Sequence, residues 1–110
     1  MKMHIDIIIV SNLSLDLSKF NNLNFKKFEF ANIQRNYIIT DANEKITFDY
    51  LIIDTFVPSL PILKENKHII TNQFFETSIE NVFAIGEINS SKKSLLEQLN
   101  IICEYIQNPF

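Results

Sequence analysis

Glycine is nearly absent from this sequence of 110 residues, in which Gly86 is the single example. Proteins contain about 7% glycine on average. Tight turns at positive φ and loops that wrap a phosphate both depend on its conformational freedom. A glycine-rich nucleotide-binding loop is therefore excluded, and every turn but one must be made by other residues.

Cysteine, histidine and tryptophan are scarce as well. Cys103 is the one cysteine, which excludes an intramolecular disulphide and a dithiol redox centre. The two histidines, His4 and His68, are far apart in the sequence, and we find no acid or second ligand beside either at the spacing of a metal site. The sequence therefore predicts no metal site and no nucleophile with a paired base.

No apolar run is long enough to cross a membrane. The longest runs, residues 7–10 and 50–53, have the length of strands, whereas a spanning helix needs about 18 apolar residues. The first six residues do not have the pattern of a signal peptide, so we expect a cytoplasmic location and no membrane partner. The net charge of −3 gives no electrostatic reason to expect nucleic acid as a partner.

What the chain does contain is typical of a small globular domain. Hydrophobic residues make up 46% of the sequence and charged residues 21%. A chain of this length can bury roughly two-thirds of the surface that it exposes when unfolded. No linker, repeat or low-complexity tail divides it, so we expect one domain over residues 1–110.

The strand pattern is strongest in five segments. Residues 3–10 are β-branched and become apolar on both faces, as in a strand at the centre of a sheet. Residues 37–40 and 45–48 flank a turn of Asp, Ala, Asn and Glu, which predicts a hairpin. Residues 50–55 and 82–85 predict two further buried strands.

The segments between these strands are less regular. Residues 25–33 predict a short strand, and residues 68–70 predict an edge strand. Residues 56–67 contain two prolines that cannot donate to a sheet, which predicts an irregular connection. Residues 11–24 fit either a strand or a short helix.

One amphipathic helix is predicted near the C-terminus. Ser90 or Ser91 would cap its start, and Asn108 followed by Pro109 would end it. The apolar positions of this helix share one face: Leu95, Leu96, Leu99, Ile102, Cys103 and Ile106. Cys103 is thus interpreted as a core residue and not as a nucleophile.

Together these elements predict a small α/β fold with a mixed or parallel central sheet, a β-hairpin or meander layer and a C-terminal amphipathic helix. Ten phenylalanines are a large aromatic content for such a domain. With a single helix to cover the sheet, one apolar face would stay exposed, which leads us to expect a homodimer or another protein partner.

Two segments in the second half resemble signatures of the pyridine nucleotide-disulphide reductases, the flavoprotein family that includes thioredoxin reductase. Residues 46–56 resemble the hairpin strand and buried strand that end in Ala-Thr-Gly in that family, and Pro58 and Pro61 follow at matching places. Residues 77–87 resemble the family's Thr-Ser followed by Gly-Val-Phe-Ala-Ile-Gly-Asp, after which a helix begins. With the helix, the matches cover roughly residues 46–107.

This resemblance implies a fold like a reduced FAD-binding domain. It also implies that Thr55, Gly86 and Glu87 are the cofactor-binding residues, with Glu87 in the place of the acid that holds the ribityl chain of the flavin. Lys92, Lys93 and the neighbouring serines could hold a phosphate at the helix start, although ordinary capping explains them too.

The chain departs from the family pattern at the parts that perform redox chemistry. Residues 11–16 contain no glycine, and the side chains of Ser11 and Leu13 would fill space that a dinucleotide phosphate needs. Phe56 replaces the glycine of Ala-Thr-Gly, Asp54 replaces its alanine, and Glu87 replaces an aspartate. We therefore expect no catalytic residues.

These departures favour a non-catalytic binding or interaction domain that is related to thioredoxin reductase and carries no cofactor. The alternative is a flavin-binding component of an FAD-dependent oxidoreductase, completed by a partner chain. A third interpretation is a structural protein whose motif matches are accidents of strand composition.

Overall fold

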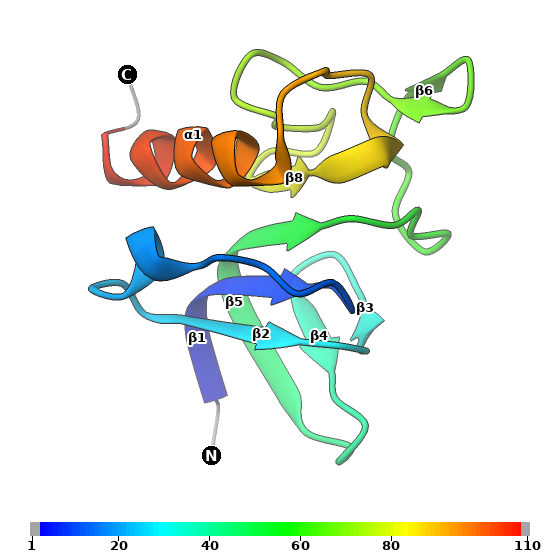
Figure 1. The fold of residues 1–110 in the computed structure, drawn as a ribbon. Coiled ribbons are helices and arrows are strands. Elements are labelled where there is room, and N and C mark those ends of the chain that lie inside the picture. The colour runs from blue at the N-terminus through cyan, green and yellow to red at the C-terminus, as the bar shows by residue number, and fades with distance from the viewer. Residues whose placement is uncertain (1–2, 109–110) are drawn as a thin grey trace.

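Two long parallel strands form the centre of the sheet (Figure 1). The computed structural model describes residues 3–108. Within this range the main sheet contains β1 (Met3–Val10), β2 (Phe25–Phe28), β3 (Asn32–Ile33), β4 (Tyr37–Ile39), β5 (Lys45–Ile53) and β8 (Val82–Ala84). The other elements are the hairpin of β6 (Lys64–Glu65) and β7 (His68–Ile69), the short 3-10 helices η1 (Ser18–Phe20) and η2 (Gly86–Ile88), and the α-helix α1 (Leu95–Gln107).

The strand order is β2-β1-β5-β4-β3, and β8 pairs with the last part of β5. β1 is parallel to both β2 and β5, and β8 is parallel to β5 through residues 51–53. The first part of β5 pairs instead with the antiparallel β4. The sheet is therefore mixed, which confirms the predicted architecture in its broad form. β2 lies on one side of β1, and β5 and β8 lie on the other side. The direction of the strand order therefore reverses between β1 and β5, and their carboxyl ends form a topological switch point.

The last residues of the two central strands are buried on both faces, as the sequence of β1 predicted. Ile7 and Ile9 belong to one apolar cluster, and Ile8 and Val10 belong to the other, because successive side chains of a strand alternate between faces. Helix α1 and η1 pack against the first cluster, and the segment around Ile69 packs against the second. Full burial of one such side chain stabilises the fold by about 1.5–3 kcal/mol.

The predicted hairpin is confirmed by the antiparallel pairing of β4 and β5. The strand expected at residues 50–55 is not a separate element, however. β5 runs from Lys45 to Ile53 without a break, because β1 pairs with it along nearly its whole length. Residues 11–24 are irregular apart from η1, and the connection at residues 56–67 contains β6.

Helix α1 is capped by Ser94, so the expectation of a cap at Ser90 or Ser91 was wrong. The Oγ of Ser94 accepts a hydrogen bond from the backbone N–H of Glu97 (3.2 Å), and the Glu97 carboxylate accepts one from the N–H of Ser94 (3.4 Å). This reciprocal pair is a capping box. Ser91 forms a turn instead, in which its hydroxyl accepts from the N–H of Lys93 (3.1 Å).

The apolar face predicted for α1 is confirmed at its centre. Leu99, Ile102 and Cys103 are almost fully buried, whereas Leu96 is 44% exposed. The polar Gln98 is buried on the same side, only 2% exposed. In the part of the chain that the structure describes, no helix is both long and apolar enough to cross a membrane.

Asparagine makes several of the turns that glycine makes in other proteins. Five non-glycine residues within residues 3–108 have positive φ, and three of them are asparagines: Asn43, Asn66 and Asn81. The short amide side chain of asparagine can bond to the nearby backbone, which lowers the cost of the left-handed conformation. The asparagine content of the chain thus offsets its lack of glycine.

Candidate functional site

Two clefts open at the switch point, on either side of Asp54 and Thr55. The first, named here the β2-side cleft, has a volume of about 480 Å³ and lies among the ends of β1, β2 and β5. The second, named the helix-side cleft, has a volume of about 550 Å³ and lies among the ends of β1, β5 and β8 and the start of α1. Sheets of this type bind ligands at such a position, in pockets of about 300–1,000 Å³.

A hydrogen bond between Ser11 and Asp54 joins the ends of β1 and β5 and separates the clefts. The Ser11 hydroxyl donates to Oδ2 of Asp54 (2.5 Å) and accepts from the backbone N–H of Leu13 (3.0 Å). Oδ1 of Asp54 is enclosed and has no hydrogen-bond partner within residues 3–108. An enclosed acceptor without a donor costs about 1–3 kcal/mol, so an N–H or O–H of a ligand that reached it would relieve that cost.

The same pair does not fit the pyrophosphate of a dinucleotide. A phosphate-binding loop presents backbone N–H groups and the start of a helix after the first strand. Here the Ser11 side chain, which is 2% exposed, occupies the position after β1 where such a loop would bind the phosphate, and it is hydrogen-bonded to the Asp54 carboxylate. Residues 11–17 form no helix. Negative charge and occupied space both oppose a phosphate at the end of β1.

The three residues that the family resemblance implies as cofactor-binding all line the helix-side cleft. Thr55 follows β5, whereas Gly86 and Glu87 begin η2 after β8. Gly86 has a φ of 80°, and a Cβ there would lie 3.5 Å from Cδ2 of Leu95, which is an ordinary contact. The backbone conformation, and not lack of space, therefore requires glycine. Glu87 is exposed, so its carboxylate can meet a ligand from solvent.

A buried polar network holds the loop between β8 and α1 in place. Oε1 of Gln98 accepts hydrogen bonds from the N–H of Gly86 (3.0 Å) and from Nδ2 of Asn89 (3.0 Å), and its Nε2 donates to the carbonyl of Lys93 (2.8 Å). Asn89 also donates to the carbonyl of Ala84 (2.8 Å). A network in which each amide has partners fixes a single conformation, so one wall of the helix-side cleft is preformed.

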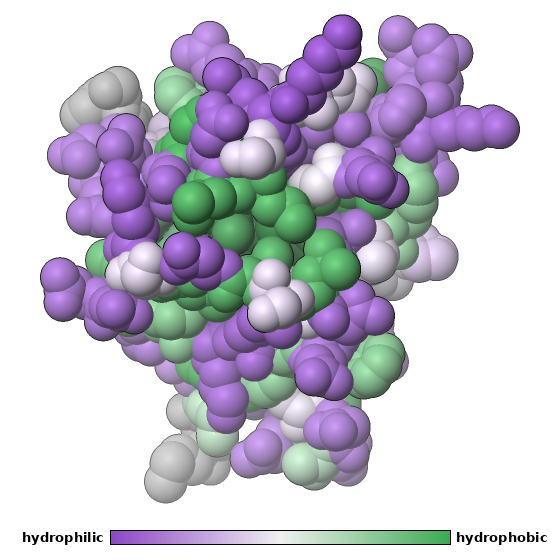
Figure 2. Space-filling view, viewed as in Figure 1, coloured by the Kyte–Doolittle hydropathy of each residue, from purple (hydrophilic) through white to green (hydrophobic). Residues whose placement is uncertain are grey.

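One side of the helix-side cleft is apolar. Leu13 and Leu95 line it, and Leu13 is 42% exposed. Figure 2 shows apolar surface gathered between α1 and the segment that follows β1, with polar side chains around it. A ligand with an apolar body and hydrogen-bonding groups at one edge would match this distribution.

The start of α1 does not offer a simple anion site. Lys93 and Ser91 line the helix-side cleft, as a phosphate site would require. The Glu97 carboxylate, however, already accepts hydrogen bonds from the N–H and the Oγ of Ser94 at the first turn. This negative charge interacts favourably with the helix dipole and opposes a second anion there.

Cys103 lies away from both clefts. Its side chain is 1% exposed, its Sγ donates to the carbonyl of Lys19 (3.3 Å), and Nε2 of Gln107 contacts the same sulphur (3.1 Å). These contacts agree with the interpretation of Cys103 as a core residue.

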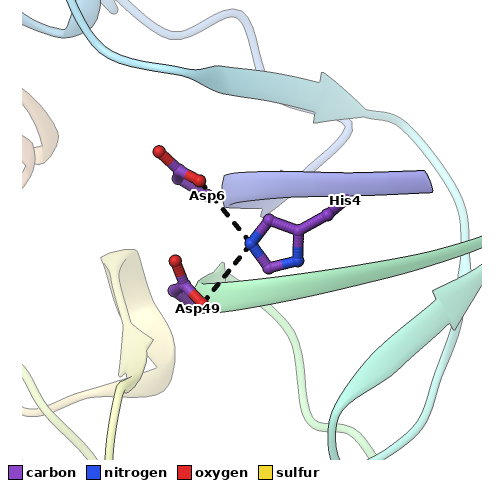
Figure 3. A group of neighbouring side chains, drawn as sticks. All are labelled: His4, Asp6 and Asp49. Carbon is purple, nitrogen blue, oxygen red and sulfur yellow. Dashed lines mark ion pairs between the residues drawn. The ribbon is translucent and has the colours of Figure 1, made fainter. Parts of the chain in front are cut away.

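The structure brings together one group that the sequence analysis missed. Nε2 of His4 lies 3.5 Å from Oδ1 of Asp6 and 3.4 Å from Oδ1 of Asp49 (Figure 3). The expectation that His4 has no acidic neighbour was therefore wrong. The pattern His-x-Asp on a strand places His4 and Asp6 on one face, which was readable, but Asp49 comes from β5 and depends on the pairing of the two strands.

Comparisons with known proteins found no similar chain: no family model matches, and neither a curated protein nor a solved structure does. The resemblance to the disulphide reductases therefore stays a prediction from the sequence. A function has to be argued from the clefts.

Proposed function

We propose that this chain is a non-catalytic binding domain, related in architecture to the flavin domain of thioredoxin reductase, that holds a small ligand in the helix-side cleft. The observation that carries the proposal is the position of this cleft, at the carboxyl ends of β1 and β5 where the strand order reverses. Its preformed wall and its mixed lining support the same conclusion.

The absence of thiol and imidazole groups from the described lining of the clefts supports a binding function. Among the described residues that line them, none is a cysteine or a histidine. The Ser11 hydroxyl is buried and committed to Asp54, so it is not available as a nucleophile. A disulphide reductase needs two thiols that exchange electrons with the flavin, and Cys103 is the one cysteine.

The lining indicates what kind of ligand fits. Thr55 and Glu87 supply exposed oxygen acceptors, and Leu13 and Leu95 supply apolar contact. A ring compound with hydroxyl or amine donors and no phosphate beside Asp54 satisfies both. Riboflavin is a suitable probe, because its ribityl chain carries hydroxyl donors and its ring system has an apolar dimethylbenzene edge.

The proposal is tested by titrating the full chain with riboflavin and with FAD, followed by flavin fluorescence. We expect saturable riboflavin binding at least as tight as that of FAD, since the pyrophosphate of FAD would meet the Asp54 carboxylate. Glu87→Gln should weaken binding several-fold, and Glu44→Gln, an exposed acid in the β4–β5 turn, is the matched control. Indifference to both compounds would contradict this ligand class.

Enzyme activity provides the second half of the test. The purified protein, with FAD supplied, should not catalyse NADPH-dependent reduction of a dye or of a disulphide. Robust turnover would refute a non-catalytic domain.

A second candidate function is a flavin-binding component of an FAD-dependent oxidoreductase, completed by a partner chain. The gathering of Thr55, Gly86 and Glu87 on one cleft favours it. This alternative predicts flavin absorption bands in the freshly purified protein and tighter binding of FAD than of riboflavin. A colourless protein that prefers riboflavin would exclude it.

We also propose that the domain forms a homodimer through the apolar border of the β2-side cleft. Phe30 is 70% exposed and Phe56 is 43% exposed, and both line that cleft. Large exposed aromatic side chains that line the same cleft are typical of interfaces. Sedimentation at micromolar concentration should give a dimer that Phe30→Ser dissociates, and a monomeric wild-type chain would refute the proposal.

A further inference from the structure

Three potential metal ligands from two neighbouring strands converge at a place remote from both clefts. Within residues 3–108, His4, Asp6 and Asp49 form the one group of three histidine, cysteine or acidic side chains whose ligand atoms all lie within 4.8 Å of one another. All three are exposed, and they lie in the first half of β1 and on β5 (Figure 3). We propose that this group binds one divalent transition-metal ion, with Zn²⁺ as its probe.

The spacing of the ligand atoms fits a metal polyhedron better than a direct ion pair. A charged N–H and a carboxylate in direct contact lie about 2.7–2.9 Å apart. Here Nε2 of His4 is 3.4 Å from Asp49 and 3.5 Å from Asp6. Two ligands at about 2.1 Å from a tetrahedral zinc are roughly 3.4 Å from each other. The two distances from His4 therefore match those of a bound ion, and the third ligand atom lies within 4.8 Å of the others.

The other ring nitrogen of His4 is held in the orientation that metal binding needs. Nδ1 lies 2.7 Å from the Thr47 hydroxyl, and that hydroxyl donates to the carbonyl of Met3 (3.3 Å). In the tautomer in which this hydroxyl proton goes to Met3, Thr47 accepts a hydrogen bond from Nδ1–H, and the lone pair of the imidazole is on Nε2, which faces the two carboxylates. Metal-ligating histidines are usually oriented in this way by a hydrogen bond to the second nitrogen.

The donor set selects the class of ion. One imidazole with two carboxylates offers one nitrogen and two oxygens, whereas Mg²⁺ and Ca²⁺ prefer oxygen alone. With three protein ligands, at least one coordination position stays open to water or to an external donor. Two neighbouring carboxylates also repel each other, and a divalent cation would neutralise both charges.

Calorimetric titration of the full chain with ZnCl₂ tests the proposal. We expect one site with micromolar affinity, and His4→Gln or Asp49→Asn should each weaken it about tenfold or more. Thr47→Val, which removes the hydroxyl that bonds to Nδ1 and to the Met3 carbonyl, should also weaken it about tenfold. The matched controls are His68→Gln and Asp41→Asn, which change the other histidine and an exposed turn acid and should leave the affinity unchanged.

A measurement on the unaltered protein keeps the test independent of variant folding. Nitrogen NMR of the imidazoles should show zinc shifting the Nε2 resonance of His4 while that of His68 stays in place. The proposal is overturned if zinc gives neither saturable heat nor a shift at His4, or if His4→Gln binds as tightly as the wild type. Competition by equimolar Mg²⁺ would overturn the assignment to transition metals.

Discussion

The substitution Gln98→Ala should disturb the wall of the helix-side cleft more than any change on the helix surface. Gln98 is 2% exposed, and its side chain makes three hydrogen bonds, to Gly86, Asn89 and Lys93. In the alanine variant Asn89 loses its bond to Gln98 but keeps its bond to the carbonyl of Ala84. The N–H of Gly86 loses its partner outright, at about 1–3 kcal/mol, and the one lost side-chain methylene adds about 0.8 kcal/mol. Because Lys93 is an exposed residue, its carbonyl can form a hydrogen bond with water in place of the lost bond to Gln98.

The expected loss of unfolding free energy is therefore about 2–4 kcal/mol, or roughly 10–20 °C in Tm for a domain of this size. Urea denaturation followed by far-ultraviolet circular dichroism measures it. Gln107→Ala removes an exposed glutamine from the same helix, whose amide donates only to the weak acceptor Sγ of Cys103 among the described residues, and should stay within about 0.5 kcal/mol. Alanine has a higher helix propensity than glutamine. The change in helix propensity would therefore stabilise the variant and cannot cause the predicted loss of stability.

A companion variant separates the acceptor from the donor. Gln98→Glu keeps an oxygen for the N–H of Gly86 but sets a second oxygen against the carbonyl of Lys93. We expect it to be destabilising at neutral pH as well. The reasoning is refuted if Gln98→Ala costs less than about 0.5 kcal/mol, or if Gln107→Ala costs as much.

Three further predictions concern backbone conformation, capping and pH. Gly86→Ala should cost about 1–2 kcal/mol in a thermal melt because φ is positive there, and an unchanged Tm would contradict this. Ser94→Ala should cost about 1 kcal/mol while Ser90→Ala is neutral in the same assay, and equal effects would contradict the observed cap. The Glu76 carboxylate raises the pKa of Tyr105 above its ordinary value of 10.0, so the stability that this phenol contributes is fully present below pH 10 and is lost as pH rises through the folded-state pKa. An ultraviolet titration should show a late phase of tyrosine ionisation that Tyr105→Phe removes, and a late phase that survives this substitution would refute the assignment.

The sequence by itself determined the elements whose pattern is local. The apolar run of β1, the hairpin around residues 41–44 and the buried face of α1 each follow from a periodicity or turn chemistry within about ten residues. The start of α1 was misplaced because several serines precede the helix, and the reciprocal bond to Glu97 decides which one caps it.

The tertiary structure decided which residues meet. Thr55 and Gly86 lie on one cleft because β5 and β8 are parallel neighbours, and Ser11 bonds to Asp54 because β1 is paired with β5 in one register. A register is set by packing over the whole sheet, so no local pattern contains it. For the same reason the sequence showed His4 and Asp6 on one face but could not supply Asp49, whose position depends on a strand that begins some forty residues later.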